Sequence, residues 1–485
     1  MEQQQQKNQQ QQHNMVIVSD QVLINGGQTW LTLTSDGMLR WLDGHGCLCV
    51  EKEVIGLSTV GDVITIRALV YDENGFCFGN GIKGRGNLLR KKFVFEPFSD
   101  QSLQNLCHKI QGYMDSLGRP KKLFIFLNPF GGKKTASKIF TSDVKPILED
   151  ANIEYTLQET RYQLHAKEVS RSLDLTKYDG ILCVSGDGTL VEVVNGLLER
   201  EDWAAAMKMP LGAIPAGTGN GMIKSVLDSA GKPCTVAHAT LTAIRGHKLS
   251  LDVATIWQGD TTFFSVLMLA WGLISDIDIE SEKYRWMGSA RIEVYALKRI
   301  LKLRKYNGSI RFVPAPGFED VGELCDDSME PVTGRHQGYY QGPKLVFHKL
   351  NWRKLNGPFV SVWLHNVPWG AEHTMAAPDA KFDDGYLDLI VIRQCPKLAL
   401  LSLMSKMNNG GHVKSPYVLY IKVKAAILEP GSRTDDSNKE GIIDSDGEVL
   451  VRGKGTYKSN LNSLMVYDKL QLVVDQGLAT LFTPI

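Results

Sequence analysis

Residues 181–189, with the sequence ILCVSGDGT, decide the fold. An unbroken apolar strand runs into a glycine turn, and the turn opens a stretch with helical apolar spacing. The same order occurs twice more, where residues 123–127 precede the loop 128–134 and residues 211–214 precede the loop 215–221. Apolar strand, glycine loop and helix, three times over, are typical of a parallel α/β sheet that is covered on both faces.

Ligands of a parallel sheet bind outside the carboxyl ends of its strands, where all three loops lie. The loops read NPFGGKK (128–134), SGDGT (185–189) and PAGTGNG (215–221). Glycines let backbone N–H groups approach a phosphate closely, and the following helix N-terminus adds a positive dipole end. One such loop alone is weak evidence, because glycine turns also arise for steric reasons. Three loops on successive strands predict a site for a nucleotide and its phosphates.

Two acidic residues near these loops differ in what their spacing permits. Asp187 stands between two glycines, and no capping role is evident for it. A carboxylate there fits a general base or a metal ligand. For Glu192 two readings stay open, because Thr189 and Glu192 have the spacing of a helix capping box. The alternative is a catalytic or Mg²⁺-linked role.

Two other glycine-containing segments match known nucleotide-binding motifs only in part. Residues 79–84 (GNGIKG) fit the dinucleotide-binding string, but they lead into the basic strand-like run 88–95 and not into a helix. Gly132 and Lys133 are similar to the end of a P-loop. However, Leu127 stands where that motif needs its first glycine, and Lys134 stands where it needs Ser or Thr. A phosphate site here must therefore use another scheme.

The length of 485 residues predicts about three domains. Residues 1–14 are rich in glutamine and are interpreted as a disordered tail. Residues 15–118 combine short β-like runs with one closing helix after Ser99, an arrangement that resembles a pleckstrin-homology-like domain. Residues 119–245 form the α/β domain. Residues 246–485 form a second, β-rich domain, with exposed insertions near 316–341 and 430–440.

The composition excludes several classes of protein. Lys and Arg number 54 and Asp and Glu number 53, a balance that argues against a dedicated nucleic-acid binder. The 8 cysteines contain no C-x-x-C pair, which disfavours a zinc or disulfide scaffold and favours a reducing compartment. The longest apolar run, 263–274, has 12 residues, short of the roughly 20 that a membrane span needs. We expect a cytoplasmic protein, at most peripheral on membranes.

In the three loops 128–134, 185–189 and 215–221, the chain resembles the diacylglycerol-kinase-type lipid kinase superfamily. Residues 270–285 (AWGLISDIDIESEKYR) are similar to the sphingosine, or long-chain-base, kinases of plants. The resemblance runs from about Lys121 to the C-terminus, apart from the two insertions. The glycine–Asp–glycine loop alone is shared with NAD kinases and phosphofructokinases, so only the combination is specific.

The resemblance implies a nucleotide-binding α/β domain followed by a β-sandwich lipid-binding domain, with the active site between them. It implies ATP and Mg²⁺ as cofactors, Asp187 as catalytic base and Asp446 as a Mg²⁺ ligand. Phe130 stands where family members often carry Arg, a loss for which Lys133 would partly compensate. The implied nucleotide-binding residues are Asn128, Gly131, Gly132, Thr160, Ser185, Gly186, Gly217, Thr218, Gly219, Arg285, Arg291, Asp446, Gly447 and Glu448.

The implied reaction is phosphorylation of the primary hydroxyl of a sphingoid base, with Asp278 recognising the head group. A carboxylate suits an ammonium through charge-assisted hydrogen bonds, whereas diacylglycerol offers no cation and would leave it unpaired. Leu267 and Met268, in the apolar run, either line the alkyl-chain pocket or simply form a buried strand. The alternatives are a ceramide or diacylglycerol kinase and, from another class, a non-catalytic lipid- or nucleotide-sensing module. A soluble NAD kinase is disfavoured by the apolar run.

The expected partners are a sphingoid base and anionic membrane lipid, with homodimerisation left open. Lys83, Arg85, Arg90, Lys91 and Lys92 form the densest basic cluster. This cluster either binds anionic lipid or protects a solvated strand edge. The expected location is the cytosolic face of a membrane whose identity the sequence does not give.

Overall fold

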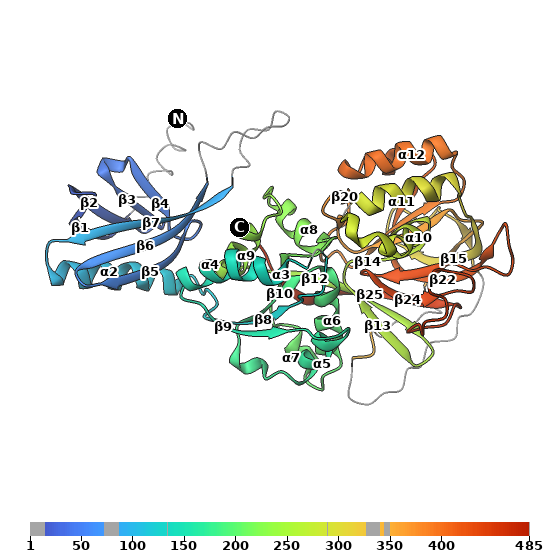
Figure 1. Ribbon diagram of the computed structural model, residues 1–485, viewed down its shortest axis with the longest axis horizontal. Helices are drawn as coiled ribbons and strands as arrows, with labels where there is room; N and C mark the ends of the chain where they lie inside the picture. Colours follow the sequence, from blue (N-terminus) through green and yellow to red (C-terminus); the bar gives the residue numbers. More distant parts are fainter. Residues whose placement is uncertain are drawn as a thin grey trace.

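The computed structural model describes residues 15–71, 87–132, 134–288, 290–325, 340–343 and 350–484, without the side chains of Asp43 and Arg285. Three bodies follow one another along the longest axis (Figure 1). An N-terminal β-rich module lies at one end, an α/β domain lies in the middle, and a second β-rich domain lies at the other end.

The N-terminal module is an antiparallel sheet closed by one helix. Its strand order is β4-β3-β2-β1-β7-β6-β5. The helix predicted after Ser99 is confirmed, since the Ser99 side chain accepts the N–H of Ser102 and caps it. Leu106, Ile110 and Met114 are buried at helical spacing against the sheet. The elements are β1 (Val16–Ile24), β2 (Gly27–Thr34), β3 (Met38–Trp41), β4 (Gly46–Cys49), β5 (Val54–Val60), β6 (Val63–Tyr71), β7 (Leu88–Pro97) and α2 (Asp100–Ser116).

Basic side chains join this module to the α/β domain. The Arg119 guanidinium donates to the carbonyl oxygens of Val50, at 2.7 Å, and Val54, at 2.8 Å. Arg90 pairs with Asp150 at 2.6 Å. Arg90, one of the predicted basic cluster, therefore uses its charge in a contact between the two domains. Of the other members, Lys91 and Lys92 are exposed, and residues 83 and 85 lie outside the described residues.

The middle domain contains the predicted parallel sheet, which is confirmed. Its strands lie in the order β9-β8-β10-β11, and Val184 pairs with both Leu127 and Ile214. The elements are β8 (Lys122–Leu127), α3 (Ala136–Ile139), α4 (Lys145–Asp150), β9 (Glu154–Glu159), α5 (His165–Ser172), β10 (Gly180–Ser185), α6 (Asp187–Leu198), α7 (Trp203–Ala206), β11 (Leu211–Pro215), α8 (Gly221–Ser229) and α9 (Val236–Arg245).

The second β-rich domain is joined to this sheet through the last strand. β25 pairs antiparallel with β12 and touches β11 in parallel at Leu211 and Leu481. Apart from β19 and β20, which pair only with each other among the described strands, the strands of both domains therefore form one continuous hydrogen-bonded network. The strands are β12 (Lys248–Gln258), β13 (Thr261–Ser265), β14 (Met268–Gly272), β15 (Tyr306–Pro314), β16 (Glu323–Leu324), β17 (Arg353–Asn356), β18 (Ser361–His365), β19 (Trp369–Ala371), β20 (Thr374–Met375), β21 (Leu387–Ile392), β22 (Leu419–Arg433), β23 (Ile442–Ser445), β24 (Glu448–Arg452) and β25 (Leu470–Phe482).

One predicted insertion is partly wrong. Residues 430–433 continue strand β22, where Arg433 pairs with Tyr306 of β15, and do not form an exposed loop. Within the other insertion, residues 326–339 lie outside the described residues.

Three helices pack together beside the β-rich domain: α10 (Leu273–Glu280), α11 (Ala290–Leu301) and α12 (Lys397–Lys406), with the short helix η4 (Ser281–Met287) between the first two. Leu273, Ile277, Ile300 and Leu403 form a buried cluster among them. The apolar run 263–274 is divided between β13, β14 and the start of α10. None of the helices in the described part of the chain has the length and apolar character that crossing a membrane requires.

Candidate active site

The three glycine loops meet at the carboxyl ends of β8, β10 and β11. A Cβ atom added to Gly217 would lie 2.3 Å from the Cα atom of Gly186. Gly132, whose φ is 52°, approaches the same loop, and its added Cβ would lie 3.0 Å from the carbonyl carbon of Gly217. Contacts this short exclude a side chain at Gly217, so packing between the loops requires glycine there. The predicted convergence of the three loops is confirmed.

The side chain of Asn128 shapes the first loop from inside. Its Oδ1 atom accepts hydrogen bonds from the N–H groups of Phe130, at 3.0 Å, and Gly131, at 3.1 Å. Its Nδ2 atom reaches Thr189 Oγ1 at 3.4 Å and links the first loop to the second. Phe130 is 60% exposed. Lys133, the expected compensating cation, lies outside the described residues.

Asp187 begins α6, and its carboxylate faces the first turn of α8. Its Oδ2 atom accepts the N–H of Gly221 at 2.9 Å, and its Oδ1 atom accepts the N–H of Met222 at 3.0 Å. The prediction that Asp187 has no capping role is wrong, because it satisfies two free N–H groups of α8. Burial raises the pKa of Asp187, while the two N–H groups oppose that rise. This side chain is therefore held in place and is more basic than a solvated aspartate.

Glu192 has the structural role of the two that the sequence left open, because it caps a helix. It does not do so through the predicted capping box. Its carboxylate accepts the N–H groups of Leu164 and Ala166, both at 3.0 Å, and so caps α5. Because Gly186 is the N-cap of α6, Thr189 is not at the cap position and the predicted capping box is wrong. Burial raises the pKa of Glu192, and the α5 amides lower it.

Asp446 occupies the turn between β23 and β24 with a φ of 56°. Its carboxylate accepts four hydrogen bonds, from the hydroxyl of Ser265 and the N–H groups of Val266, Leu267 and Met268, at 2.6 to 3.0 Å. Burial raises its pKa to about 6, although these donors lower it. Asp446 therefore holds the tight turn that connects β13 to β14.

The predicted role of Asp446 as a magnesium ligand stays a prediction, because the turn uses most of the carboxylate's hydrogen-bonding capacity but not all of it. Three of its donors bond to Oδ1 and one bonds to Oδ2, so Oδ2 keeps one of the roughly four lone-pair positions that a carboxylate offers. Glu448, two residues on, accepts the side-chain N–H of Gln163 at 2.6 Å. Across the residues that the structure describes, no group of three or more His, Cys, Asp or Glu side chains is arranged to hold a metal ion.

Asp278 on α10 and Arg291 on α11 form a polar corner across from the glycine loops. Arg291 Nη2 lies 3.7 Å from Asp278 Oδ1, and Arg291 Nη1 donates to Ser281 Oγ at 2.9 Å. Arg291 is buried, whereas Asp278 is only half-buried. Arg285 lies on η4, and its side chain is outside the described part of the chain.

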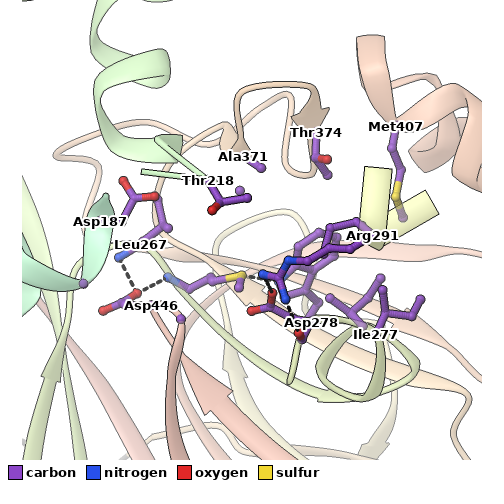
Figure 2. A pocket seen from close by; sticks show the side chains of 18 of the residues that line it. Asp187, Thr218, Leu267, Ile277, Asp278, Arg291, Ala371, Thr374, Met407 and Asp446 are labelled. Carbon is purple, nitrogen blue, oxygen red and sulfur yellow. Dashed lines mark hydrogen bonds and ion pairs between the residues drawn. The ribbon is translucent and has the colours of Figure 1, made fainter. Parts of the chain in front are cut away.

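These groups enclose a cavity of about 260 Å³. Figure 2 shows Asp187 and Thr218 at one side of it, with Asp278 and Arg291 across the space. We call the three glycine loops the glycine wall, and the cavity-lining residues of α10, α11, α12 and Met407 the helical wall. The lining residues are Asp187, Gly188, Thr218, Gly219, Leu267, Met268, Ile274, Ile277, Asp278, Glu282, Arg291, Ile292, Trp363, Gly370, Ala371, Thr374, Met404, Met407, Asp446 and Gly447.

Eight of the predicted nucleotide-binding residues do not line this cavity. Gly217 and Thr218 line an adjoining groove of about 600 Å³. The hydroxyl of Thr160 is buried and donates to the carbonyl of Leu127 at 3.4 Å. The hydroxyl of Ser185 donates to the carbonyl of Gly186 at 2.8 Å. The residues outside the cavity lining are Asn128, Gly131, Gly132, Thr160, Ser185, Gly186, Gly217 and Glu448.

The sequence did not reveal most of the apolar lining. Of residues 263–269, Leu267 and Met268 line the cavity, and Phe264 packs elsewhere, with its ring 5.7 Å from that of Tyr340. The missed residues come from three helices and a strand. An apolar helical stripe has the same spacing whether it faces a core or a ligand. The missed apolar residues are Ile274, Ile277, Ile292, Trp363, Met404 and Met407.

Known proteins match this chain both by domain and over its whole length. Residues 122–256 match the diacylglycerol kinase catalytic domain, and residues 353–466 match the YegS C-terminal NAD kinase beta sandwich-like domain. Sphingosine kinase 1 of Arabidopsis thaliana is 58% identical over 487 aligned residues, which cover 100% of both chains. The chain belongs to the sphingosine kinase family. Sphingosine kinase 1 of Homo sapiens is 34% identical, with 69% of this chain and 88% of that protein aligned.

Other relatives place the sphingosine kinase family within its superfamily. Ceramide kinase of Homo sapiens is 28% identical over 338 residues, which cover 63% of this chain and 62% of that protein. A solved structure assigned as a diacylglycerol kinase, from Bacillus anthracis str. Sterne, matches with a TM-score of 0.50 at 18% identity. It covers 76% of this chain and 96% of that one, and it shows a shared fold. The predicted superfamily and the predicted β-sandwich-like domain are both confirmed.

Proposed function

We propose that this member of the sphingosine kinase family transfers the γ-phosphoryl group of ATP to the primary hydroxyl of a sphingoid long-chain base. The products are ADP and a long-chain-base 1-phosphate. One observation carries the proposal: Asp187, Asp278 and Arg291 line a single cavity between the glycine loops and an apolar helical wall. The proposed proton acceptor Asp187, the proposed ammonium-binding Asp278 and the proposed phosphate-binding Arg291 therefore line one cavity.

The nucleotide is proposed to bind along the glycine wall. Main-chain N–H groups of the glycine loops favour an anion there, whereas the first two N–H groups of α8 are held by Asp187. Arg291, together with Arg285, would neutralise charge that develops on the transferred phosphoryl oxygens. Mg²⁺ would arrive with ATP, held by phosphate oxygens and water, since Mg²⁺ retains much of its hydration. The other proposed contacts are Asn128, Gly131, Gly132, Thr160, Ser185, Gly186, Gly217, Thr218, Gly219, Gly447 and Glu448.

Asp187 is proposed to accept the proton of the attacking hydroxyl. The hydroxyl oxygen bonds to the γ-phosphorus as the bond to the β-bridging oxygen breaks, and ADP leaves with that electron pair. The two α8 amides fix the orientation of the carboxylate. Its raised pKa strengthens it as a base.

Asp278 is proposed to bind the ammonium of the substrate. Its 3.7 Å pairing with Arg291 is long enough to exchange for a direct charge-assisted hydrogen bond. Ceramide and diacylglycerol carry no ammonium, and neither would offer this carboxylate a charge-assisted hydrogen bond in exchange. The alkyl chain would lie against Leu267, Met268 and the helical wall.

Two further features belong to the proposal. The seven-strand order with a closing helix supports a pleckstrin-homology-like identity for the N-terminal module, residues 15–118.

The exposed Lys91 and Lys92 support weak attraction of this module to anionic lipid, at about 1 kcal/mol per charge near the surface. Liposome co-sedimentation of the full chain and of a Lys91→Glu, Lys92→Glu variant tests this attraction, and unchanged binding would remove the idea.

A radiolabelled-ATP assay over a lipid panel tests the function. The panel contains sphingosine, dihydrosphingosine, phytosphingosine, ceramide and diacylglycerol, with the Asp187→Asn variant as the enzyme control. We expect labelled product from the three free bases and none from the other two lipids. Product from ceramide or diacylglycerol alone would reassign the substrate. No product from any lipid would favour a non-catalytic sensing role.

A further inference from the structure

A short hairpin of the second β-rich domain packs against a helix of the α/β domain. The hairpin consists of β19 and β20, and the helix is α8; they meet where the two domains join (Figure 1). The main-chain N–H of Trp369 donates to Ser225 Oγ at 3.0 Å, and that of Glu372 donates to the carbonyl of Gly219 at 2.7 Å. A Cβ atom added to Gly221 would lie 2.6 Å from the carbonyl oxygen of Trp369. The hairpin therefore touches the start of α8 at backbone distance.

Side chains lock the same contact. Lys224 is 9% exposed, and its Nζ atom lies 2.8 Å from Asp228 Oδ1 and 4.1 Å from the centre of the Trp369 ring. The indole N–H of Trp369 donates to Asp228 Oδ2 at 3.1 Å. The carboxylate thus holds an ammonium and an indole at once, and the ammonium also rests on the indole face. We call this set, Lys224, Asp228 and Trp369, the clamp.

The clamp lies between two parts of the active site. On one side, the first N–H groups of α8 hold the Asp187 carboxylate. On the other side, the hairpin presents Gly370, Ala371 and Thr374 to the cavity. A path of direct contacts therefore runs from the proposed base through α8 and the clamp to the part of the cavity lining that the hairpin forms.

We propose that Trp369 is a positioning residue that fixes Asp187 relative to the acceptor side of the cavity, an inference that rests on the proposed function. The hairpin contacts the third glycine loop at Gly219 and Gly221. Loosening the clamp leaves the loops 128–134 and 185–189 in place, and ATP still binds to them. The acceptor hydroxyl then loses its alignment with Asp187 and the phosphorus. Water reaches the γ-phosphorus instead, and its oxygen takes the phosphoryl group to give ADP, inorganic phosphate and a proton.

The experiment compares three variants of the full chain. Trp369→Phe removes the indole N–H and keeps an aromatic ring over Lys224. Trp369→Leu removes the ring as well. Trp352→Leu is the matched control, because Trp352 is 4% exposed and packs in a separate core cluster with Trp257 and Ile427. ADP release and lipid phosphate are measured together at saturating ATP and sphingosine, and exchange of the Gly221 and Met222 amides is followed by native-state hydrogen exchange.

For Trp369→Leu we expect kcat for lipid phosphate to fall at least tenfold, with an unchanged KM for ATP and an increased ratio of ADP to lipid phosphate. We expect faster exchange of the two α8 amides. Trp369→Phe should retain more of the activity and coupling than Trp369→Leu does. Trp352→Leu should lower the melting temperature and leave the coupling ratio and the α8 amides unchanged.

Two results would overturn the proposal: normal coupling in Trp369→Leu, or the same loss of coupling in Trp352→Leu. The exchange measurement needs no lipid, so it separates this inference from the proposed function. If the wild-type chain phosphorylated no long-chain base, the function would fail. Unchanged α8 exchange in Trp369→Leu would refute the clamp alone.

Discussion

The glycine wall and the helical wall bound the same cavity but are built from different parts of the chain. The glycine wall presents main chain, packed so closely that an added Cβ at Gly217 would lie 2.3 Å from Gly186. The helical wall presents flexible or branched side chains such as Ile277 and Met404. Main-chain atoms cannot retreat by changing rotamer, whereas methionine has three rotatable bonds and adapts to its surroundings. One added methyl group should therefore damage the glycine wall more than the exchange of a whole side chain damages the helical wall.

The largest effect should follow from Asp187→Asn, which removes the proposed base where the two walls meet. Turnover should fall by about 10²- to 10⁴-fold, the usual contribution of a general base. ATP binding should stay nearly intact, because the loops that carry it are unchanged. Single-turnover rates and calorimetric ATP titration measure the two properties. Near-normal turnover would exclude Asp187 as the base.

The pH profile of the wild-type enzyme provides a second test at the same residue. The base works ionised, so kcat/KM should rise with pH through the pKa of Asp187. Because burial raises that pKa, the acid limb should lie above the ordinary aspartate value of about 3.9. The residual rate of Asp187→Asn should lack this limb. A limb that survives the substitution belongs to another group.

Asp278→Asn should act next most strongly and on one substrate. Loss of a hydrogen bond to a charged group costs about 1.5–3 kcal/mol, so the KM for sphingosine should rise about 10- to 150-fold. The KM for ATP should not change. Glu293→Gln, an exposed carboxylate on α11, is the control and should leave both values unchanged. Equal rises for both substrates would count against a head-group role.

Gly217→Ala tests the rigidity of the glycine wall with a single methyl group. Overpacking of this kind costs about 1–3 kcal/mol, and the KM for ATP should rise while the melting temperature falls. Gly112→Ala is the matched control, because Gly112 lies within α2 and an added Cβ there meets no atom within 4 Å. The control should gain about 0.5–1 kcal/mol of stability. Normal ATP affinity in Gly217→Ala would show that the loops can separate.

The glycine wall was predictable from the sequence because close backbone approach demands glycine, and glycine spacing is visible in the chain. The position of Asp187 followed from the same loop. Its contacts did not, since they depend on Gly221 and Met222 of α8, more than thirty residues further along the chain. The role of Asp446 as a metal ligand was predicted only from the family resemblance. Only the folded turn shows its four donors.

The apolar residues of the helical wall could not be predicted, because Met404 and Ile277 have the spacing of ordinary core residues. Strand order was equally hidden. The join of β25 to β11 through Leu211 and Leu481 brings together residues that are far apart in sequence. No local pattern encodes that pairing, whereas each apolar strand of the α/β domain carries its own signal.

Met404→Leu should have the smallest effect and completes the comparison. The exchange alters the shape of a side chain on the helical wall and keeps its volume, a change that usually costs less than about 1.5 kcal/mol. The KM for sphingosine should therefore change less than about tenfold, with kcat and the KM for ATP unchanged. Steady-state kinetics of Met404→Leu and Gly217→Ala are measured in parallel. The two variants compare the walls directly, because the glycine variant adds one carbon whereas the methionine variant changes the shape of a whole side chain. If Met404→Leu proved the more harmful of the two, the helical wall would be the rigid one, and alkyl-chain recognition would depend on its fixed shape.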